Sequence, residues 1–228
     1  MKALYDFFSL IYPVNCPACG KAIAKGETLL CTICRYELPE TGYHKVQQNP
    51  VVQKFYGRIK FEFAFSYLHF HKSGIVQAIL HQYKYRNQPE IGEKLGEWFA
   101  LDILDSFSPI PWDVIIPIPL HRSNEKKRGY NQSNYFAAGL SGILGIPWSD
   151  KAVIRTMKSE TQTHKSKMER WKNVKDIFEA SDAALINSKH ILLVDDVITT
   201  GATLESCGQM LLDAGATKVS IATLATAR

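Results

Sequence analysis

The sequence lacks a long apolar run. No stretch of its 228 residues approaches the ~20 apolar residues that a membrane-spanning helix needs, so we expect no transmembrane segment. The opening MKALYDFFSLIYP is weakly similar to a signal peptide, but Asp6 interrupts its apolar stretch. Leu4, Phe7, Phe8 and Ile11 fall at helical spacing, which favours a short packed helix instead. We therefore expect a cytoplasmic protein.

The sequence also lacks internal repeats, low-complexity segments and a strong charge imbalance. Its net charge of +5 permits a polyanionic partner but does not require one. The 7 histidines show no spacing typical of metal sites. With 46% hydrophobic and 21% charged residues, the chain has the composition of a soluble globular protein. Its length suits one α/β domain with a small appendage.

Cysteine is scarce outside one short region. Of the 5 cysteines, all but one lie near the start as two C-x-x-C pairs, Cys16, Cys19, Cys31 and Cys34. Such pairs can place four thiolates tetrahedrally around one Zn²⁺ and leave no coordination position open. Disulfides are the alternative, which a cytoplasmic chain disfavours, and iron of the rubredoxin type suits the same ligands. We predict a zinc ribbon over residues 1–42, and expect metal loss to unfold roughly the first 40 residues while the core survives.

Residues 43–110 are predicted to form a linker and a hood-like segment. The polar stretch at 41–50, TGYHKVQQNP, has the composition of a linker. Residues 61–70 are aromatic-rich with partial alternation, which favours a strand or a hairpin arm. Two predicted helices follow over residues 73–104. A basic and aromatic elbow separates these helices, formed by Lys84, Tyr85 and Arg86.

Residues 111–228 alternate between predicted strands and predicted helices. The strands are expected at 113–119, 151–154, 191–194 and 218–227. The helices are expected from about 133 to Gly145 and from about 203 to 214, with polar loops at 121–132 and 155–176. This alternation implies an α/β core, a parallel sheet with helices on both faces.

The segment ILLVDDVITTGAT, positions 191–203, carries the strongest functional signal. In a parallel sheet, ligands bind beyond the carboxyl ends of the strands, where we expect Asp195 and Asp196. Two adjacent carboxylates can accept hydrogen bonds from vicinal hydroxyls, as on a ribose, or help to hold a divalent cation. The small residues that follow lead into a helix, whose N-terminus offers free N–H groups to an anion. An ordinary strand, turn and threonine N-cap would explain the loop but not the paired acids, so we predict a sugar-phosphate site.

This segment resembles the phosphoribosyl pyrophosphate (PRPP) signature of type I phosphoribosyltransferases. Other segments are similar to the ComF family of competence-associated proteins, whose N-terminal zinc finger matches the four cysteines. Further ComF-like patterns are Pro117-Ile118-Pro119-Leu120-His121, Arg128-Gly129-Tyr130-Asn131-Gln132, and the spaced residues Gln162, Arg170, Asn173 and Phe178. The resemblance covers nearly the whole chain and implies a type I phosphoribosyltransferase-like fold.

The resemblance also implies roles for individual residues. Asp195 and Asp196 would hold the ribose hydroxyls and, with Arg128, would be the catalytic residues. The 5′-phosphate would lie on Thr199, Thr200, Gly201, Ala202 and Thr203. The pyrophosphate loop would be formed by Pro119, Leu120, His121 and Arg122. Pyrophosphate charge would be offset by Arg122, Lys126, Lys127 and Arg128, with Mg²⁺ bridging its oxygens. The segment 155–176, with seven basic residues against three acids, would be the mobile loop that closes over PRPP, although a solvated loop explains its composition equally well.

Three functions remain open from the sequence. The chain is a PRPP-binding protein in competence-linked DNA uptake or processing, a genuine transferase acting on a nucleobase or another small acceptor, or a PRPP-sensing regulator without turnover. In the first case the partners would be single-stranded DNA and a competence helicase. The DNA contacts would then come from the zinc finger and from Lys84, Tyr85, Arg86, Lys165, Lys167 and Arg170.

Overall fold

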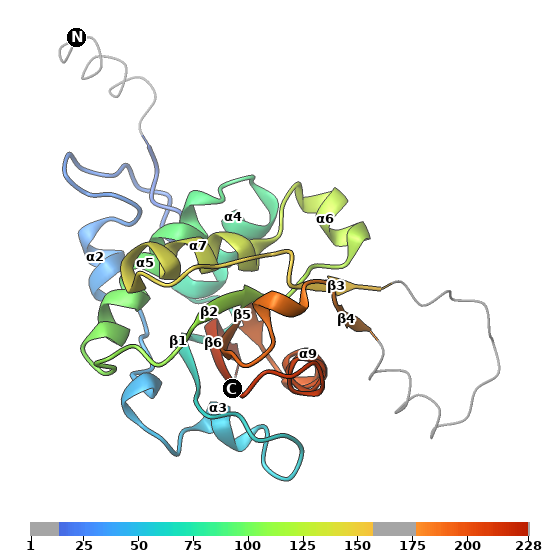
Figure 1. Ribbon diagram of the computed structural model, residues 1–228. Coiled ribbons are helices and arrows are strands. Elements are labelled where there is room, and N and C mark those ends of the chain that lie inside the picture. The colour runs from blue at the N-terminus through green and yellow to red at the C-terminus, as the bar shows by residue number, and fades with distance from the viewer. Residues whose placement is uncertain (1–13, 157–176, 228) are drawn as a thin grey trace.

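The fold is built around one four-stranded sheet, seen at the centre of the computed structural model in Figure 1, which describes residues 14–156 and 177–227. The strands lie in the order β1-β6-β5-β2, and every neighbouring pair is parallel. Their bounds are β1 Ala64–Phe70, β2 Val114–Pro117, β5 His190–Ile198 and β6 Lys218–Ala227. All four carboxyl ends therefore meet at one edge of the sheet, as the sequence predicted for an α/β core.

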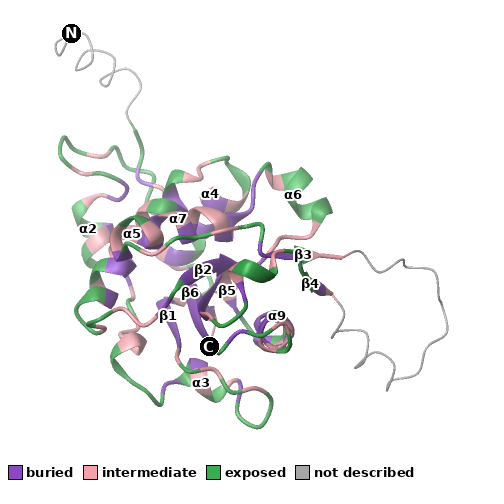
Figure 2. Cartoon of the chain, in the orientation of Figure 1, coloured by how far each residue is buried: buried purple, intermediate pink, exposed green. Residues whose placement is uncertain are grey.

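Helices cover both faces of this sheet. The longer ones are α4 Ile75–Tyr85, α5 Glu90–Leu104, α7 Gln132–Leu144 and α9 Ala202–Asp213. The helices α4, α5 and α7 pack on one face, while α9 and the short α3, Pro50–Gln53, pack on the other (Figure 1). Figure 2 shows the strands as the most buried elements, with exposed residues on the outer sides of the helices. Among the described residues, no helix combines the length and the apolar character that crossing a bilayer requires.

The helices α5 and α7 approach each other unusually closely because both carry glycine at the contact. A Cβ atom built at Gly139 would lie 2.0 Å from the carbonyl oxygen of Glu93, and one at Gly96 would lie 2.6 Å from that of Phe136. Backbones can come this near only where no side chain intervenes. This contact fixes α7, whose first turn carries residues of the candidate site.

The strand predicted at 151–154 does not join the central sheet. The strand β3, Val153–Arg155, pairs antiparallel with β4, Phe178–Ala180, in a separate two-stranded sheet. Sequence reasoning missed β4, because three residues carry too little periodicity to indicate a strand. This two-stranded sheet brackets residues 157–176, so the predicted mobile loop lies outside the described residues, as does the helix predicted near the N-terminus.

The predicted polar loop at 121–132 is wrong over most of its length, because Arg122–Arg128 forms the helix α6. Its signals are local: the His121 ring accepts a hydrogen bond from the Ser123 N–H, and Gly129 ends the helix in a left-handed conformation at φ +84°. No proline, glycine or β-branched residue interrupts the seven residues between them. Figure 2 shows this helix on the surface, which explains why it has no apolar periodicity.

The described N-terminal residues, from position 14 onward, and the predicted linker pack against the core. The helix α2, Thr32–Tyr36, lies beside α5, where the Arg35 guanidinium stacks 4.4 Å from the centre of the Trp98 ring. Chain segment 39–41 pairs with β1 through the Thr41 N–H and the Tyr67 carbonyl oxygen at 2.8 Å. After the 3-10 turn Tyr43–Lys45, the buried Asn49 side chain caps α3 and donates to the Ala64 carbonyl oxygen at 2.9 Å. Residues 39–63 thus connect the N-terminal residues firmly to the sheet.

Candidate functional site

The candidate site lies at the carboxyl edge of the sheet, around Asp195 and Asp196 of β5. The predicted strand was too short, since β5 continues beyond both acids to Ile198. Its pairing with β6 skips Asp196 and resumes at Val197 in the same register. Both acids are half-buried, and their partners Ser133 of α7 and Lys84 of α4 lie on helices that pack on the same face of the sheet.

Each of the two carboxylates contacts other residues of the protein through one of its oxygens. Asp195 Oδ1 accepts hydrogen bonds from Ser133 Oγ at 3.0 Å and from the Asp196 N–H at 2.9 Å. Asp196 Oδ2 forms an ion pair with Lys84 Nζ at 2.7 Å. No donor in the described parts of the chain reaches the other oxygen of either group. The pair therefore presents two fixed acceptor oxygens, which suits two neighbouring hydroxyl groups.

The position of Asp195 makes its ionisation unfavourable. Burial, followed by repulsion from Asp196, raises the pKa of the Asp195 carboxyl to about 7. The hydrogen bonds from the Asp196 N–H and Ser133, and the charge of Lys84, act in the opposite direction. A carboxyl group that titrates near neutral pH at the mouth of a sheet is typical of a functional site.

The loop after β5 is held by residues that the sequence did not suggest. Thr199 and Thr200 are exposed, Gly201 has φ +83°, and Ala202 begins α9. The Ala202 N–H donates to Thr200 Oγ1 at 3.5 Å, whereas the next N–H groups of the first turn have no acceptor within the helix. Arg58 donates to the Thr200 carbonyl oxygen at 3.1 Å and pairs with Glu205 at 2.6 Å. A Cβ atom at position 201 would lie 2.7 Å from the Phe55 ring, so only glycine fits. Sequence separation hid this support, because Phe55 and Arg58 lie in the segment predicted as linker and hood.

The loop after β2 brings the other predicted residues to the same edge. Pro119, Leu120 and His121 are half-buried, while Arg122 is exposed at the start of α6. The Asn131 amide donates to the Ile118 carbonyl oxygen at 2.9 Å, which ties this loop to the start of α7. On α6, Lys126 and Lys127 are exposed, whereas Arg128 Nη1 donates to Gln132 Oε1 at 2.7 Å. The arginine is thus anchored, and the two exposed lysines can move to follow a ligand.

One residue of the predicted elbow, Lys84, contacts the acid pair. Lys84 and Tyr85 form the end of α4, and Arg86 is its C-cap. Lys84 contacts Asp196, and the Arg128 guanidinium lies 5.8 Å from the centre of the Tyr85 ring. Tyr85 and Arg86 are exposed, whereas Lys165, Lys167 and Arg170 lie outside the described residues.

The four N-terminal cysteines come together as predicted. The sulfur atoms of Cys16, Cys19, Cys31 and Cys34 all lie within 4.8 Å of one another. The Sγ atoms of Cys19 and Cys31 are 3.8 Å apart, close to the ~3.8 Å edge of a tetrahedron with metal–sulfur bonds of ~2.3 Å. Although burial opposes ionisation, N–H groups of Cys31, Cys19 and Ala18 lower the pKa of the Cys16 thiol to about 7. The cluster therefore fits a metal ion held by four thiolates, as in a zinc ribbon.

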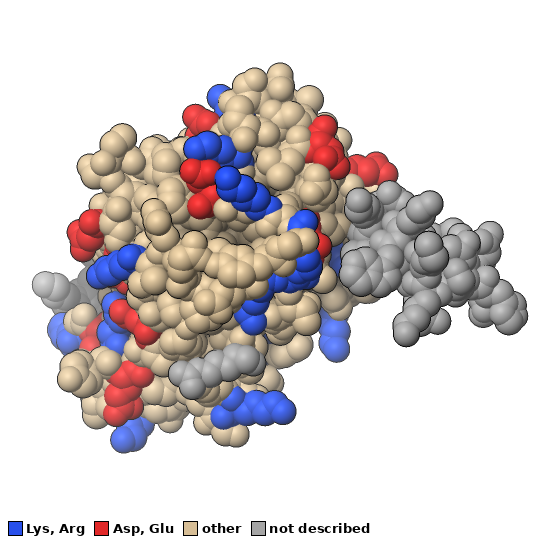
Figure 3. Space-filling model, turned by 90° about the horizontal axis from the view of Figure 1, so that it is seen from below, with Lys and Arg blue, Asp and Glu red and all other residues tan. Residues whose placement is uncertain are grey.

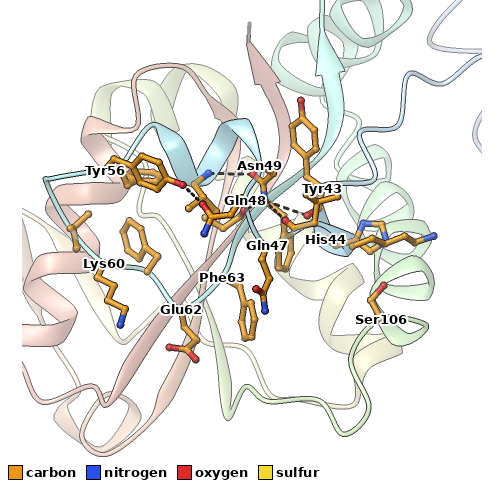
Figure 4. A pocket seen from close by; sticks show the side chains of 18 of the residues that line it. Tyr43, His44, Gln47, Gln48, Asn49, Tyr56, Lys60, Glu62, Phe63 and Ser106 are labelled. Carbon is orange, nitrogen blue, oxygen red and sulfur yellow. Dashed lines mark hydrogen bonds between the residues drawn. The ribbon is translucent and has the colours of Figure 1, made fainter.

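A large cavity lies apart from the acid pair. It has a volume of about 1070 Å³ and is lined by residues between 43 and 65 together with Ser106 and Phe107. Figure 4 shows Gln48, Asn49 and Tyr56 on one side of it, and Lys60, Glu62 and Phe63 on another. Neither acid lines the cavity, and it has no paired carboxylates. The chemistry of the acid pair therefore belongs at the sheet edge.

Basic side chains do not dominate the face shown in Figure 3, where Lys and Arg are interspersed with Asp and Glu. The modest net charge of +5 agrees with this distribution. A nucleic-acid surface made by this face alone would have a weak field.

Comparisons with known proteins identify relatives of this chain. Residues 131–228 match the model of the phosphoribosyl transferase domain. The DNA utilization protein YhgH of Shigella flexneri is 33% identical over 147 residues, which cover 63% of this chain and 63% of that relative. Competence protein F of Haemophilus influenzae is 32% identical over 154 residues, which cover 65% of this chain and 67% of that relative.

A solved structure is similar to part of the chain. Glutamine PRPP amidotransferase from B. subtilis, complexed with ADP and GMP, matches 63% of this chain and 30% of its own with a TM-score of 0.45 and 23% identity. The matches to competence protein F and to the phosphoribosyl transferase domain, together with the parallel sheet and the cysteine cluster, show that the chain belongs to the ComF family and has a type I phosphoribosyltransferase-like fold.

Proposed function

We propose that the site binds PRPP. The observation that carries this proposal is that Asp195 and Asp196, each with one oxygen that meets no donor in the described residues, lie near the end of β5, just before the loop that leads into α9. The two oxygens would accept the 2′- and 3′-hydroxyls of the ribose. The N–H groups of the loop and of the first turn of α9 would bind the 5′-phosphate. Arg122, Lys126 and Lys127 would lie along the pyrophosphate, with Mg²⁺ entering as part of the bound substrate.

The arrangement supports pyrophosphate departure from C1 of the ribose. Cations on α6 would stabilise charge that develops on the leaving pyrophosphate, and the acid pair would hold the ribose while positive charge grows at C1. A transferase also needs an acceptor that attacks C1. Two functions are therefore compatible with PRPP binding: a true transferase that acts on a nucleobase or another small nucleophile, and a sensor that binds PRPP without turning it over.

Calorimetry with PRPP, with and without Mg²⁺, tests the binding site. In the variant with Asp195→Asn and Asp196→Asn, amides replace the charged acceptors. Charge-assisted hydrogen bonds contribute roughly 1.5–3 kcal/mol each, so affinity should fall by about a hundredfold or more. A loss below about tenfold in a folded variant would show that the acids do not bind the ribose. Gly142→Ala, on the exposed side of α7, provides a control that should bind as the wild type does.

Release of pyrophosphate separates the two alternatives. If the chain is a transferase, incubation with PRPP, Mg²⁺ and a panel of nucleobases, amines and single-stranded DNA should release pyrophosphate with at least one acceptor. A sensor should also bind PRPP, but it should release no pyrophosphate above the uncatalysed rate with any of these acceptors.

We also propose a structural zinc ion on the four cysteines and a role in competence-linked DNA uptake or processing. The zinc proposal rests on the sulfur geometry, and the DNA role rests on the similarity to a DNA utilization protein and a competence protein. The exposed Tyr85 and Arg86 would supply stacking and charge to a single strand, and a competence helicase would act with the chain.

The DNA role has its own test in the segment 155–176. If this segment binds single-stranded DNA, replacing Lys165, Lys167 and Arg170 with Gln should remove up to three phosphate contacts. The slope of log affinity against log salt should then flatten by roughly 0.7 for each of these phosphates, while PRPP still binds. Loss of PRPP binding with unchanged DNA binding would instead identify this segment as a lid.

A further inference from the structure

Lys84 lies beside the acid pair of the proposed ribose site. Its Nζ is 2.7 Å from Asp196 Oδ2, and the two side chains are only 19% and 16% exposed. Solvent screens such a pair less than it screens an ion pair on the open surface. Within residues 14–156 and 177–227, Lys84 is the one cation in ion-pair contact with either acid.

The end of α4 is held firmly against α7. The Tyr83 hydroxyl donates to the Gln132 carbonyl oxygen, and the Tyr130 hydroxyl donates to the Tyr83 carbonyl oxygen. Tyr83 is fully buried, and Tyr85, two residues later, faces Arg128. Since Ser133 at the start of α7 donates to Asp195, the same two helices position both the lysine and the acids. The ammonium group is therefore part of a rigid arrangement.

The acid pair creates an electrostatic problem for a phosphorylated sugar. Two adjacent carboxylates offer good acceptors for hydroxyls, yet they repel phosphate groups bound a few ångströms away. Lys84 cancels one of these two charges without occupying the unused oxygen of Asp196. The acceptor remains, and the repulsion decreases.

We propose that Lys84 is a positioning residue of the ribose site, which fixes Asp196 and offsets the charge of the acid pair so that a polyphosphorylated ribose can bind. This role differs from the DNA contact that the sequence suggested for Lys84, and it rests on the proposed PRPP site. It makes a distinctive prediction, because a charge effect must grow with the number of phosphate groups on the ligand, whereas a purely structural effect would not.

The test compares ribose 5-phosphate, with a single phosphate group, and PRPP, which also carries a pyrophosphate, by calorimetry at constant salt. Lys84→Met and Lys84→Gln should both weaken PRPP binding by about tenfold or more, and ribose 5-phosphate binding by only about threefold. Lys84→Arg should restore both affinities to within about threefold of the wild type. Lys94→Met is the matched control, because Lys94 forms its 2.5 Å ion pair with Glu97 on α5 and not with either acid. Thermal melting of each variant checks that it is folded. If methionine disturbs the packing, the comparison uses the Lys84→Gln variant.

Several results would overturn the inference. Unchanged PRPP affinity in Lys84→Gln would show that the lysine does not act on the ligand. Equal losses for the two ligands would assign it a structural role only, and an equal loss in Lys94→Met would remove any special role. If the wild type binds neither ligand, the proposed PRPP site itself fails, which is a distinct outcome because it appears before any variant is compared.

Discussion

At the scale of single residues, the acid pair of the proposed site lowers the stability of the fold. Asp195 is close to a second carboxylate and partly removed from water, and its pKa is raised to about 7. Such strain persists only where the surrounding structure holds the groups in place, here through Ser133 and Lys84. The sequence predicted the two acids and their edge of the sheet, but it could not pair Lys84 with Asp196, because that contact depends on how α4 meets β5.

The raised pKa of Asp195 predicts how stability depends on pH. A carboxyl whose pKa is higher in the folded chain than in the unfolded chain binds more protons when folded, so its contribution falls as the pH rises from about 4 to about 7. Asp195→Asn cannot ionise and should not show this loss. Urea denaturation at pH 5 and pH 8 should find that the wild type loses about 2 kcal/mol relative to the variant. Parallel pH profiles would show that Asp195 ionises as freely as an exposed aspartate.

At the scale of elements, the parts with a long hydrophobic period were predicted best. The sheet strands β2 and β6 and the helices α7 and α9 lie where the sequence placed them, and β5 begins there but runs on to Ile198, because burial imposes a regular pattern on these elements. The helix α6 was missed because it is short and exposed, and the pairing of β3 with β4 depends on a strand of three residues. Phe55 and Arg58, which support the loop after β5, were missed because no local pattern links them to it.

The close approach of α5 to α7 gives a test at this scale. Gly139→Ala should destabilise the fold by roughly 1–3 kcal/mol, because its Cβ would lie 2.0 Å from the Glu93 carbonyl oxygen and the backbone must shift. A Cβ atom at Gly142 on the same helix would meet nothing within 4 Å apart from the local helix backbone, so Gly142→Ala should stabilise the fold by roughly 0.5–1 kcal/mol, because alanine favours the helix. Chemical denaturation of both variants measures the difference. Two shifts of the same sign would contradict the described packing.

At the scale of the whole molecule, the cysteine cluster and the sheet share one core. Cys16, Leu30 and Cys34 are buried in the same apolar cluster as Phe99 of α5 and Leu68 of β1. The sequence led us to expect an N-terminal part that unfolds on its own. The packing argues otherwise, because apolar residues of the core would lose their cover together with the metal.

Metal removal should therefore destabilise the entire chain. With chelator present, thermal unfolding followed by calorimetry should show one transition at a lower temperature than in the metal-loaded protein, since metal binding contributes to the folding of such clusters. Cys16→Ser should behave in the same way, and metal analysis of the wild type should find one zinc ion per chain. Two separate transitions, with the second unchanged by the chelator, would show that the cysteine region is an independent unit.

The central claim is that the edge formed by the acid pair and the loop after β5 binds the ribose phosphate of PRPP. A crystal structure of the chain with PRPP and Mg²⁺ tests it most directly. We predict the two ribose hydroxyls within hydrogen-bond distance of the Asp195 and Asp196 carboxylates, and the 5′-phosphate on the N–H groups of Thr199–Thr203. The claim would be contradicted by clear density for PRPP elsewhere, for example in the cavity lined by residues between 43 and 65, while the acid pair contacts Ser133 and Lys84 but no ligand.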